Sequence, residues 1–355
     1  MTELRSSRVG SILLALLCVL SFGQVAIPCT RVVYLGPNGT VITGRSMDWN
    51  VDIGTNLWIL PRGAHRTGQA GPHSLEWTSK YGSVVAPGYD ISTTDGMNEK
   101  GFVANLLWLA ESEYEKPNPS KPGLAISLWA QYVLDNFATV NEAVDYLSQE
   151  PFVVVTAEVP GQERLATLHL SISDVTGDSA IVEYIGGKQV IHHDRKYQVM
   201  TNSPTYEKQL AMEEYWRQIG GTVMLPGTNR AADRFARAAF YIKAIPQEED
   251  PQMALASVFS VIRNVSVPYY GITTPDQPNI SSTRWRTVAD QKRLVYFFES
   301  AVTPNTFWVN LQDIDFSAET GKVMKLDLRK NQRNVHAGNV AKEFQPSAPF
   351  QFLGL

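Results

Sequence analysis

The sequence is poor in cysteine. Its 355 residues contain two, Cys18 and Cys29, both within the first thirty positions, which excludes a disulfide framework. An excess of basic charge is also missing: 31 Lys and Arg stand against 35 Asp and Glu, for a net charge of −4, and no basic block occurs. This balance argues against a nucleic-acid groove or a patch for an anionic membrane. It favours a small, uncharged or weakly polar substrate.

The motifs of common zinc and serine hydrolases are absent as well. No HExxH, CxxC or Gly-x-Ser-x-Gly pattern occurs in the sequence. The commonest zinc-hydrolase and serine-hydrolase interpretations are therefore excluded. His192 and His193 are adjacent in a stretch typical of a strand. Neighbouring side chains of a strand point to opposite faces and cannot readily share a metal ion. We therefore expect neither a metal site nor a cofactor.

Residues 1–28 have the pattern of a secretory leader. Arg5 and Arg8 come first, an apolar run over 11–20 follows, and small and polar residues come next. A membrane-spanning helix needs about 20 apolar residues, roughly twice the length of this run, and no second such run occurs later. We predict that 1–28 is removed and that the mature chain is periplasmic or secreted, with no membrane span.

Removal of this leader would leave Cys29 as a lone cysteine. A single thiol is unusual in an exported protein, so Cys29 is either an accident or a catalyst. As the first residue of the mature chain it would hold a thiol and a free α-amine, with ordinary pKa values of about 8.5 and 7.7–8.0. The amine can then accept the thiol proton. The sequence thus offers an N-terminal cysteine nucleophile that needs no histidine partner.

The mature chain alternates between groups of strands and groups of helices. The turn Pro37-Asn38-Gly39 predicts a hairpin close to Cys29. Further strands are expected over 102–109, 165–173, 180–185, 190–193, 284–288, 294–299 and 307–311. Helices are expected over 124–134, 139–147, 230–242 and 253–263, the second of them opened by a capping box of Thr139 and Glu142. This order predicts an α+β fold of antiparallel sheets covered by helices, in a single domain over 29–355.

Two charged residues lie on the strand that the hairpin brings back beside Cys29. They are Arg45 and Asp48, in the segment Gly44-Arg45-Ser46-Met47-Asp48-Trp49. A cation next to a cysteine lowers the pKa of its thiol, and a carboxylate would hold the terminal amine. An ordinary ion pair at a sheet edge is the alternative interpretation, which the spacing alone leaves open.

Several longer motifs resemble a single family. They are Cys29-Thr30-Arg31, Arg45-Ser46-Met47-Asp48-Trp49, Asp95-Gly96-Met97-Asn98-Glu99-Lys100-Gly101, Thr201-Asn202-Ser203-Pro204-Thr205, Leu225-Pro226-Gly227 and Arg234-Phe235-Ala236-Arg237. In this order, from Cys29 to about residue 312, they resemble the choloylglycine hydrolase family. That family contains bile salt hydrolases and penicillin V acylases. The resemblance implies an N-terminal-nucleophile hydrolase with a four-layer αββα sandwich.

The resemblance also implies roles for individual residues. Cys29 resembles the nucleophile and, through its freed amine, the base. Arg45 and Asp48 resemble the pair that holds the thiol and the amine. Asn202 resembles the side-chain donor to the oxyanion, and Arg234 resembles a second catalytic arginine.

The family's other oxyanion contact falls on Trp108, on the strand that follows Gly101. This position is commonly Asn in bile salt hydrolases and Tyr in some penicillin acylases. A Trp ring cannot make the hydrogen bonds of Asn and offers apolar stacking area instead. We therefore expect Trp49, Leu107 and Trp108 to line an apolar substrate pocket, with an ordinary core position as the alternative for Trp108. This pattern resembles the Gram-negative branch, whose members tend to take phenoxyacetyl or fatty-acyl amides, including acyl-homoserine lactones.

We predict an exported amidase that cleaves a small linear amide through a thioester on Cys29, without a cofactor. Penicillin V acylase-like activity is the main expectation, and conjugated bile salts are the alternative substrates. An alternative of another class is an inactive periplasmic binding protein on the same fold. We also expect a homo-oligomer, although the segment between Asn202 and Leu225 is shorter than the insertion that knits tetramers in Gram-positive members. Pro28 suits signal peptidase poorly, so Ile27 and Pro28 would be left for autocatalytic removal.

Overall fold

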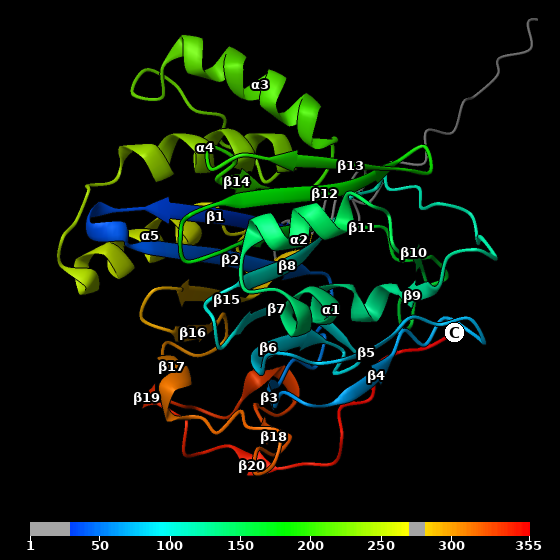
Figure 1. Cartoon of the computed structure of the whole chain (residues 1–355). Helices are drawn as coiled ribbons and strands as arrows, with labels where there is room; N and C mark the ends of the chain where they lie inside the picture. The colour runs from blue at the N-terminus through cyan, green and yellow to red at the C-terminus, as the bar shows by residue number, and fades with distance from the viewer. Residues whose placement is uncertain (1–28, 270–280) are drawn as a thin grey trace, which may run out of the picture.

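The computed structural model describes residues 29–269 and 281–355, and the predicted leader lies outside these ranges. Two large sheets pack face to face, and helices cover the outer face of each sheet (Figure 1). The order of layers is helix, sheet, sheet, helix. The predicted α+β class and four-layer αββα sandwich are confirmed.

The first sheet has seven strands in the order β14-β1-β2-β15-β16-β17-β19. They are β1 (Cys29–Leu35), β2 (Val41–Trp49), β14 (Val199–Met200), β15 (Ser282–Asp290), β16 (Val295–Ser300), β17 (Thr306–Asn310) and β19 (Gly338–Asn339). The predicted hairpin joins β1 to β2, and its register pairs Cys29 with Met47. This register places Cys29 next to the segment that carries Arg45 and Asp48.

The second sheet has nine strands in the order β13-β12-β11-β8-β7-β6-β3-β18-β20. They are β3 (Leu57–Leu60), β6 (Ser83–Gly88), β7 (Ser92–Asn98), β8 (Val103–Trp108), β11 (Leu168–Ser173), β12 (Ser179–Ile185), β13 (Lys188–His193), β18 (Met324–Leu326) and β20 (Gln345–Pro346). Two small pairs lie apart from it, β4 (His65–Thr67) with β5 (Glu76–Thr78) and β9 (Gly123–Ala125) with β10 (Val153–Val155). The sequence analysis predicted β8, β11, β12 and β13 but no strand between residues 50 and 101.

Two helices cover the nine-stranded sheet and three lie on the side of the seven-stranded sheet (Figure 1). They are α1 (Trp129–Asn136) and α2 (Val140–Leu147), then α3 (Tyr206–Ile219), α4 (Ala231–Ala244) and α5 (Pro251–Asn264). The predicted capping box of Thr139 and Glu142 opens α2. The helix predicted over 124–134 begins later, at Trp129, because Gly123–Ala125 pairs with β10 as a strand.

The contact between β2 and α5 depends on a glycine. A Cβ atom at Gly44 would lie 2.7 Å from Ile262 Cγ1 and 3.1 Å from Val258 Cγ1. Both α5 side chains are fully buried, so they have little room to move aside. The distance between this helix and the strand that carries Arg45 is therefore set by the missing side chain.

Gly44→Ala is expected to lower the free energy of unfolding by about 1–3 kcal/mol, because an added group in a packed core displaces its neighbours. Urea denaturation measures this value. Gly227→Ala is the matched control, since a Cβ there meets nothing within 4 Å. Equal effects of the two substitutions would show that α5 does not rest on Gly44.

Candidate active site

Cys29 is held at both of its main-chain groups. It opens β1 and is only 3% exposed. Its N–H donates to Asn202 Oδ1 over 2.5 Å, and its carbonyl oxygen accepts from Arg234 Nη1 over 2.6 Å. These contacts within the protein hold the first residue of β1 in place without a substrate.

Arg45 reaches from β2 across to the second sheet. Its Nη2 lies 4.0 Å from Cys29 Sγ and donates to the carbonyl oxygen of Leu106 over 3.0 Å. The Nη1 of Arg45 is buried and has no hydrogen-bond partner among the described residues. Burial raises the pKa of the Cys29 thiol, and the positive charge of Arg45 acts against that rise. Arg45 is therefore the cation placed to favour the thiolate.

Asp95 anchors Arg45 between the sheets. Its Oδ2 lies 3.8 Å from Arg45 Nε and accepts from Asn105 Nδ2 over 2.6 Å and from Thr287 Oγ1 over 3.1 Å. The hydroxyl of Tyr296 donates to its other oxygen. Burial raises the pKa of Asp95, and the charge of Arg45 opposes the rise. Asp95 belongs to a sequence motif, yet no role for it is predicted from the sequence, because Thr287 and Tyr296 come from strands far away in the chain.

Asp48 lies on the opposite face of β2 from Arg45. Its carboxylate accepts from Thr283 Oγ1 and, over 3.3 Å, from Ser46 Oγ. Its main-chain oxygen lies 3.8 Å from Cys29 Sγ. Burial raises the pKa of Asp48, and the charge of Arg234 is the main opposing influence. The alternative of an ordinary Arg45–Asp48 ion pair does not hold, because residues three apart in a strand face opposite sides and Arg45 pairs with Asp95 instead.

Asn202 and Arg234 contact Cys29 and each other. Asn202 follows β14, and its Nδ2 donates to the carbonyl oxygen of Trp108 over 2.8 Å. Its Oδ1 accepts from Arg234 Nη2 over 2.8 Å as well as from Cys29. Arg234 extends from α4 and also donates to Thr30 Oγ1. Burial lowers the pKa of Arg234 to about 10, and the charge of Asp48 opposes the fall.

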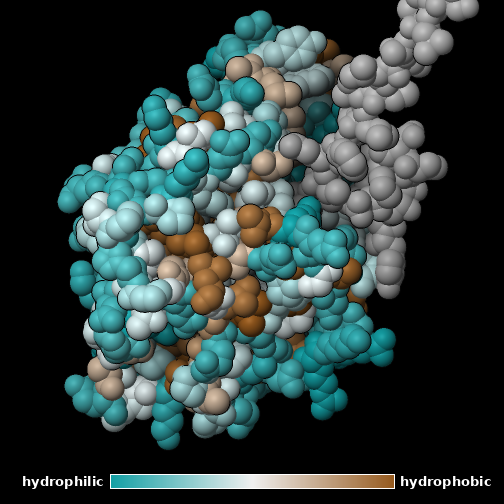
Figure 2. All heavy atoms as spheres, turned by 90° about the vertical axis from the view of Figure 1, so that its right-hand side faces the viewer, coloured by the Kyte–Doolittle hydropathy of each residue, from teal (hydrophilic) through white to brown (hydrophobic). Residues whose placement is uncertain are grey.

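An apolar pocket opens beside the thiol. Cys29, Arg45, Trp49 and Trp108 all line it, with the Trp49 and Trp108 rings 5.9 Å apart between centroids. Figure 2 shows the hollowed face of the molecule on which apolar side chains gather. Further wall positions that the sequence analysis missed come from loops and the C-terminus, at Ile53, Tyr89, Ile91, Val159 and Leu353. No local pattern marks these residues, since they meet only in the folded chain.

Leu107 is not among the lining residues, so its predicted place in the pocket is corrected. Leu106 and Trp108 line the pocket instead. Successive residues of a strand face opposite sides, and Leu107 packs in the buried cluster between the sheets.

The two adjacent histidines have separate partners. His192 Nε2 lies 3.8 Å from Glu183 Oε2, whereas His193 Nε2 lies 2.8 Å from Asp178 Oδ2. Across residues 29–269 and 281–355, no group of three or more His, Cys, Asp and Glu side chains could hold a metal ion. Over the same ranges, no helix has the length and apolar character needed to cross a membrane.

The chain is similar in sequence to known enzymes. It is 58% identical to a penicillin V acylase from Pectobacterium atrosepticum, with 99% of each chain covered. It is 27% identical to a bile salt hydrolase/transferase from Clostridium perfringens, with 77% of this chain and 89% of the relative covered.

The chain is also similar in fold to solved structures. The structure of a penicillin V acylase from Agrobacterium tumefaciens superposes with a TM-score of 0.87 at 65% identity, covering 92% of this chain and 100% of that chain. A mutant conjugated bile acid hydrolase from Clostridium perfringens shares the fold, with a TM-score of 0.72 at 22% identity over 84% and 96% of the two chains. Residues 29–325 match the family model for linear amide C-N hydrolases of the choloylglycine hydrolase family. The family that the sequence motifs resemble is thus confirmed, and the chain belongs to the choloylglycine hydrolase family.

Proposed function

We propose that this protein is a penicillin V acylase-like enzyme that hydrolyses linear amides of apolar acyl groups through Cys29. One observation carries the proposal: the thiol of Cys29 lies between the Arg45 guanidinium and a pocket walled by two tryptophans. The identity of 58% to a penicillin V acylase, over nearly the whole chain, supports this substrate class. Fatty-acyl amides, including N-acyl-homoserine lactones, fit the same apolar wall.

We infer that residues 1–28 are removed during export and that this step frees the amine of Cys29. The family match begins at Cys29, and Asn202 Oδ1 already lies 2.5 Å from the Cys29 nitrogen. Removal of any remaining Ile27 and Pro28 would be autocatalytic, and the mature enzyme would be periplasmic or secreted. We also propose a homo-oligomer, supported by exposed apolar side chains on and after α3 at Met212, Tyr215, Val223 and Met224.

The freed residue would supply both nucleophile and base. The α-amine takes the proton of the thiol, and Arg45 stabilises the thiolate. Sγ then forms a bond to the amide carbonyl carbon, and the C–N bond breaks as the amine leaves with the proton from the α-ammonium group. Water attacks the resulting thioester, releases the carboxylic acid and restores the thiol.

Two N–H groups are placed to bind the oxyanion of the intermediate. Asn202 Nδ2 carries two protons, and only the contact with the Trp108 carbonyl occupies it among the described residues. The N–H of Leu109 donates to the carbonyl oxygen of Thr167, the residue just before β11. Consecutive N–H groups of a strand point to opposite sides, so the N–H of Trp108 points away from β11. That is the side on which Arg45 and Asn202 contact β8.

Cys29→Ala is expected to abolish hydrolysis of penicillin V and leave the unfolding temperature close to that of wild type, because the small side chain removes the nucleophile without adding bulk. Product release measured by chromatography checks the activity. Cys18→Ser is the matched control and should retain full turnover, since Cys18 belongs to the leader. Hydrolysis by the Cys29→Ala variant would place the nucleophile elsewhere, and an inactive wild type would favour the binding-protein alternative.

Arg45→Gln is expected to move the pH midpoint of Cys29 alkylation upward. Loss of the neighbouring positive charge destabilises the thiolate and raises the pKa of the thiol further. Arg45→Lys keeps the charge and should move the midpoint less. The rate of iodoacetamide labelling against pH reports this, because Cys29 is the one cysteine of residues 29–355. Identical midpoints in both variants and wild type would contradict the role given to Arg45.

Trp108→Leu is expected to lower kcat/KM for penicillin V by about tenfold, because the loss of a buried ring contact costs about 1.5 kcal/mol. Trp216→Leu, on α3 and away from the pocket, is the matched control and should have no effect. The same measurement on acyl-homoserine lactones and glycine-conjugated cholate defines the acyl preference. If the cholate conjugate has the highest kcat/KM in wild type, the bile salt hydrolase alternative is correct.

A further inference from the structure

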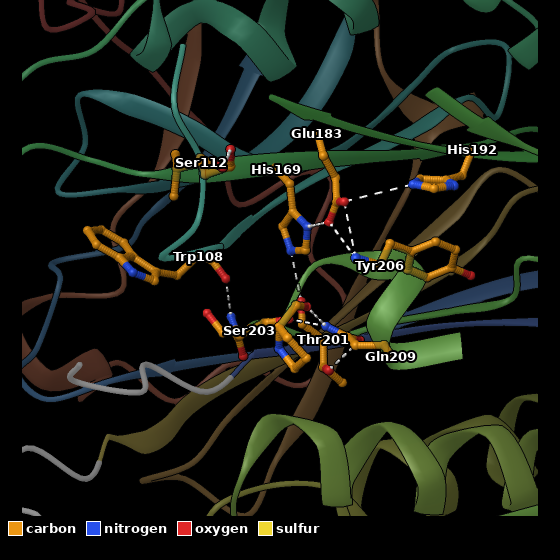
Figure 3. Close-up of polar contacts among 12 residues, drawn as sticks. Trp108, Ser112, His169, Glu183, His192, Thr201, Ser203, Tyr206 and Gln209 are labelled. Atoms are coloured by element: carbon orange, nitrogen blue, oxygen red, sulfur yellow. Dashed lines mark hydrogen bonds and ion pairs between the residues drawn. The ribbon is translucent and has the colours of Figure 1, made fainter. Parts of the chain in front are cut away.

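A buried histidine–carboxylate pair, His169 and Glu183, lies beside Thr201, the residue that precedes Asn202 (Figure 3). His169 comes from β11 and Glu183 from the neighbouring β12, and both are at most 1% exposed. His169 Nδ1 lies 3.1 Å from Glu183 Oε1. On its other side, His169 Nε2 lies 2.8 Å from the carbonyl oxygen of Thr201. The ring therefore connects the nine-stranded sheet to the residue that precedes Asn202.

Oxygen atoms face both ring nitrogens of His169. A carbonyl oxygen only accepts hydrogen bonds, so Nε2 donates to Thr201. Glu183 also receives the main-chain N–H of Tyr206, which lies 3.1 Å from each carboxylate oxygen. Such contacts favour the ionised carboxylate, which again only accepts. Nδ1 lies 3.1 Å from this carboxylate, so both ring nitrogens of His169 have an oxygen partner.

Glu183 has further titratable neighbours. His192 on β13 lies 3.8 Å from the second carboxylate oxygen of Glu183. Burial alone would raise the pKa of Glu183, but hydrogen bonds from His169 and His192 bring it to about 2. The side chain of Tyr206, at the start of α3, packs against His192 at 5.0 Å between ring centroids. Among these described neighbours, Glu183 is the one group with a negative charge near the ring.

The backbone around Asn202 is held on the other side as well. Gln209 Nε2 donates to the carbonyl oxygens of Asn202 and Pro204. Thr201 Oγ1 donates to Gln209 Oε1 over 3.0 Å. His169 is the contact that fixes the carbonyl oxygen of the Thr201–Asn202 peptide itself. A shift of that peptide would carry the Asn202 side chain away from Cys29.

We propose that His169 and Glu183 are positioning residues that aim the Asn202 side chain at Cys29 and at the reacting carbonyl. The inference rests on the function proposed above. Neither side chain lines the substrate pocket, so both act through the Thr201–Asn202 peptide. A buried polar pair contributes little net stability compared with apolar side chains of similar shape. Stability alone is therefore a poor explanation for this pair.

Two substitutions separate positioning from a general structural role. In His169→Gln the side-chain amide nitrogen can occupy the place of Nε2 and still donate to Thr201, so kcat for penicillin V should stay near the wild-type value. In His169→Asn the amide reaches only the place of Nδ1, so kcat should fall about 10- to 100-fold. KM should change little in either variant, because the pocket wall is untouched. His193→Gln, which alters only the neighbouring pair with Asp178, is the control and should match wild type.

Nitrogen NMR of 15N-histidine-labelled protein gives a readout independent of turnover. Nε2 of His169 should carry a proton in wild type, as donation to Thr201 requires, and Glu183→Gln should change the nitrogen shifts of the ring, because Nδ1 loses its carboxylate partner. A His169 Nε2 that carries no proton in wild type, or equal kcat for the folded Gln and Asn variants at position 169, would overturn the proposal. A wild type that hydrolyses none of the acyl amides would instead contradict the proposed function.

Discussion

The geometry of the site depends on how the first residue of β1 is held. Asn202 accepts from the Cys29 nitrogen and Arg234 donates to the Cys29 carbonyl oxygen, while Arg234 also donates to Asn202. These three side-chain contacts form a closed set that links the seven-stranded sheet, the segment after β14 and α4. The first residue of a strand would otherwise fray, since the ends of ordered segments are poorly fixed unless they are tied down. The site is therefore built around a firmly held start of β1.

The space between the sheets supplies the electrostatics. Arg45 and Asp95 meet there, and Asn105, Thr287 and Tyr296 surround the carboxylate. Buried charges are costly unless they are paired and hydrogen-bonded, so this network compensates for placing a cation next to the thiol. The apolar pocket lies on the same side of the molecule. The site thus combines the polar Arg45–Asp95 network with an apolar pocket, and this combination suits an amide with an apolar acyl group.

The sequence predicted the parts of the fold that are coded locally. The hairpin turn after β1, the capping box of α2 and the apolar strands β8 and β11 all depend on neighbouring residues. The strand Ser92–Asn98 was missed because its residues are mostly polar or small, and their burial is imposed by partners on either side. The surface helix α3 was missed for a related reason, since few of its side chains are buried.

Contacts between residues distant in the chain also limited what could be predicted of the candidate site. The motifs identified Cys29, Arg45, Asn202 and the others by resemblance, but strand alternation was needed to exchange Leu107 for Leu106 in the pocket. The partners Asp95 and His169 carry no local signal, because each acts on a residue that is distant in the chain. Long-range contacts across the two sheets decide these roles, and they follow only from the tertiary fold.

The central claim is that acyl transfer occurs on a terminal Cys29. Rapid quenching during turnover of penicillin V, followed by peptide mapping with mass spectrometry, tests it most directly. We expect an N-terminal peptide that begins with Cys29-Thr30-Arg31 and carries the phenoxyacetyl group as a thioester. An acyl group on any other residue, or an active chain that still carries Pro28, would contradict it.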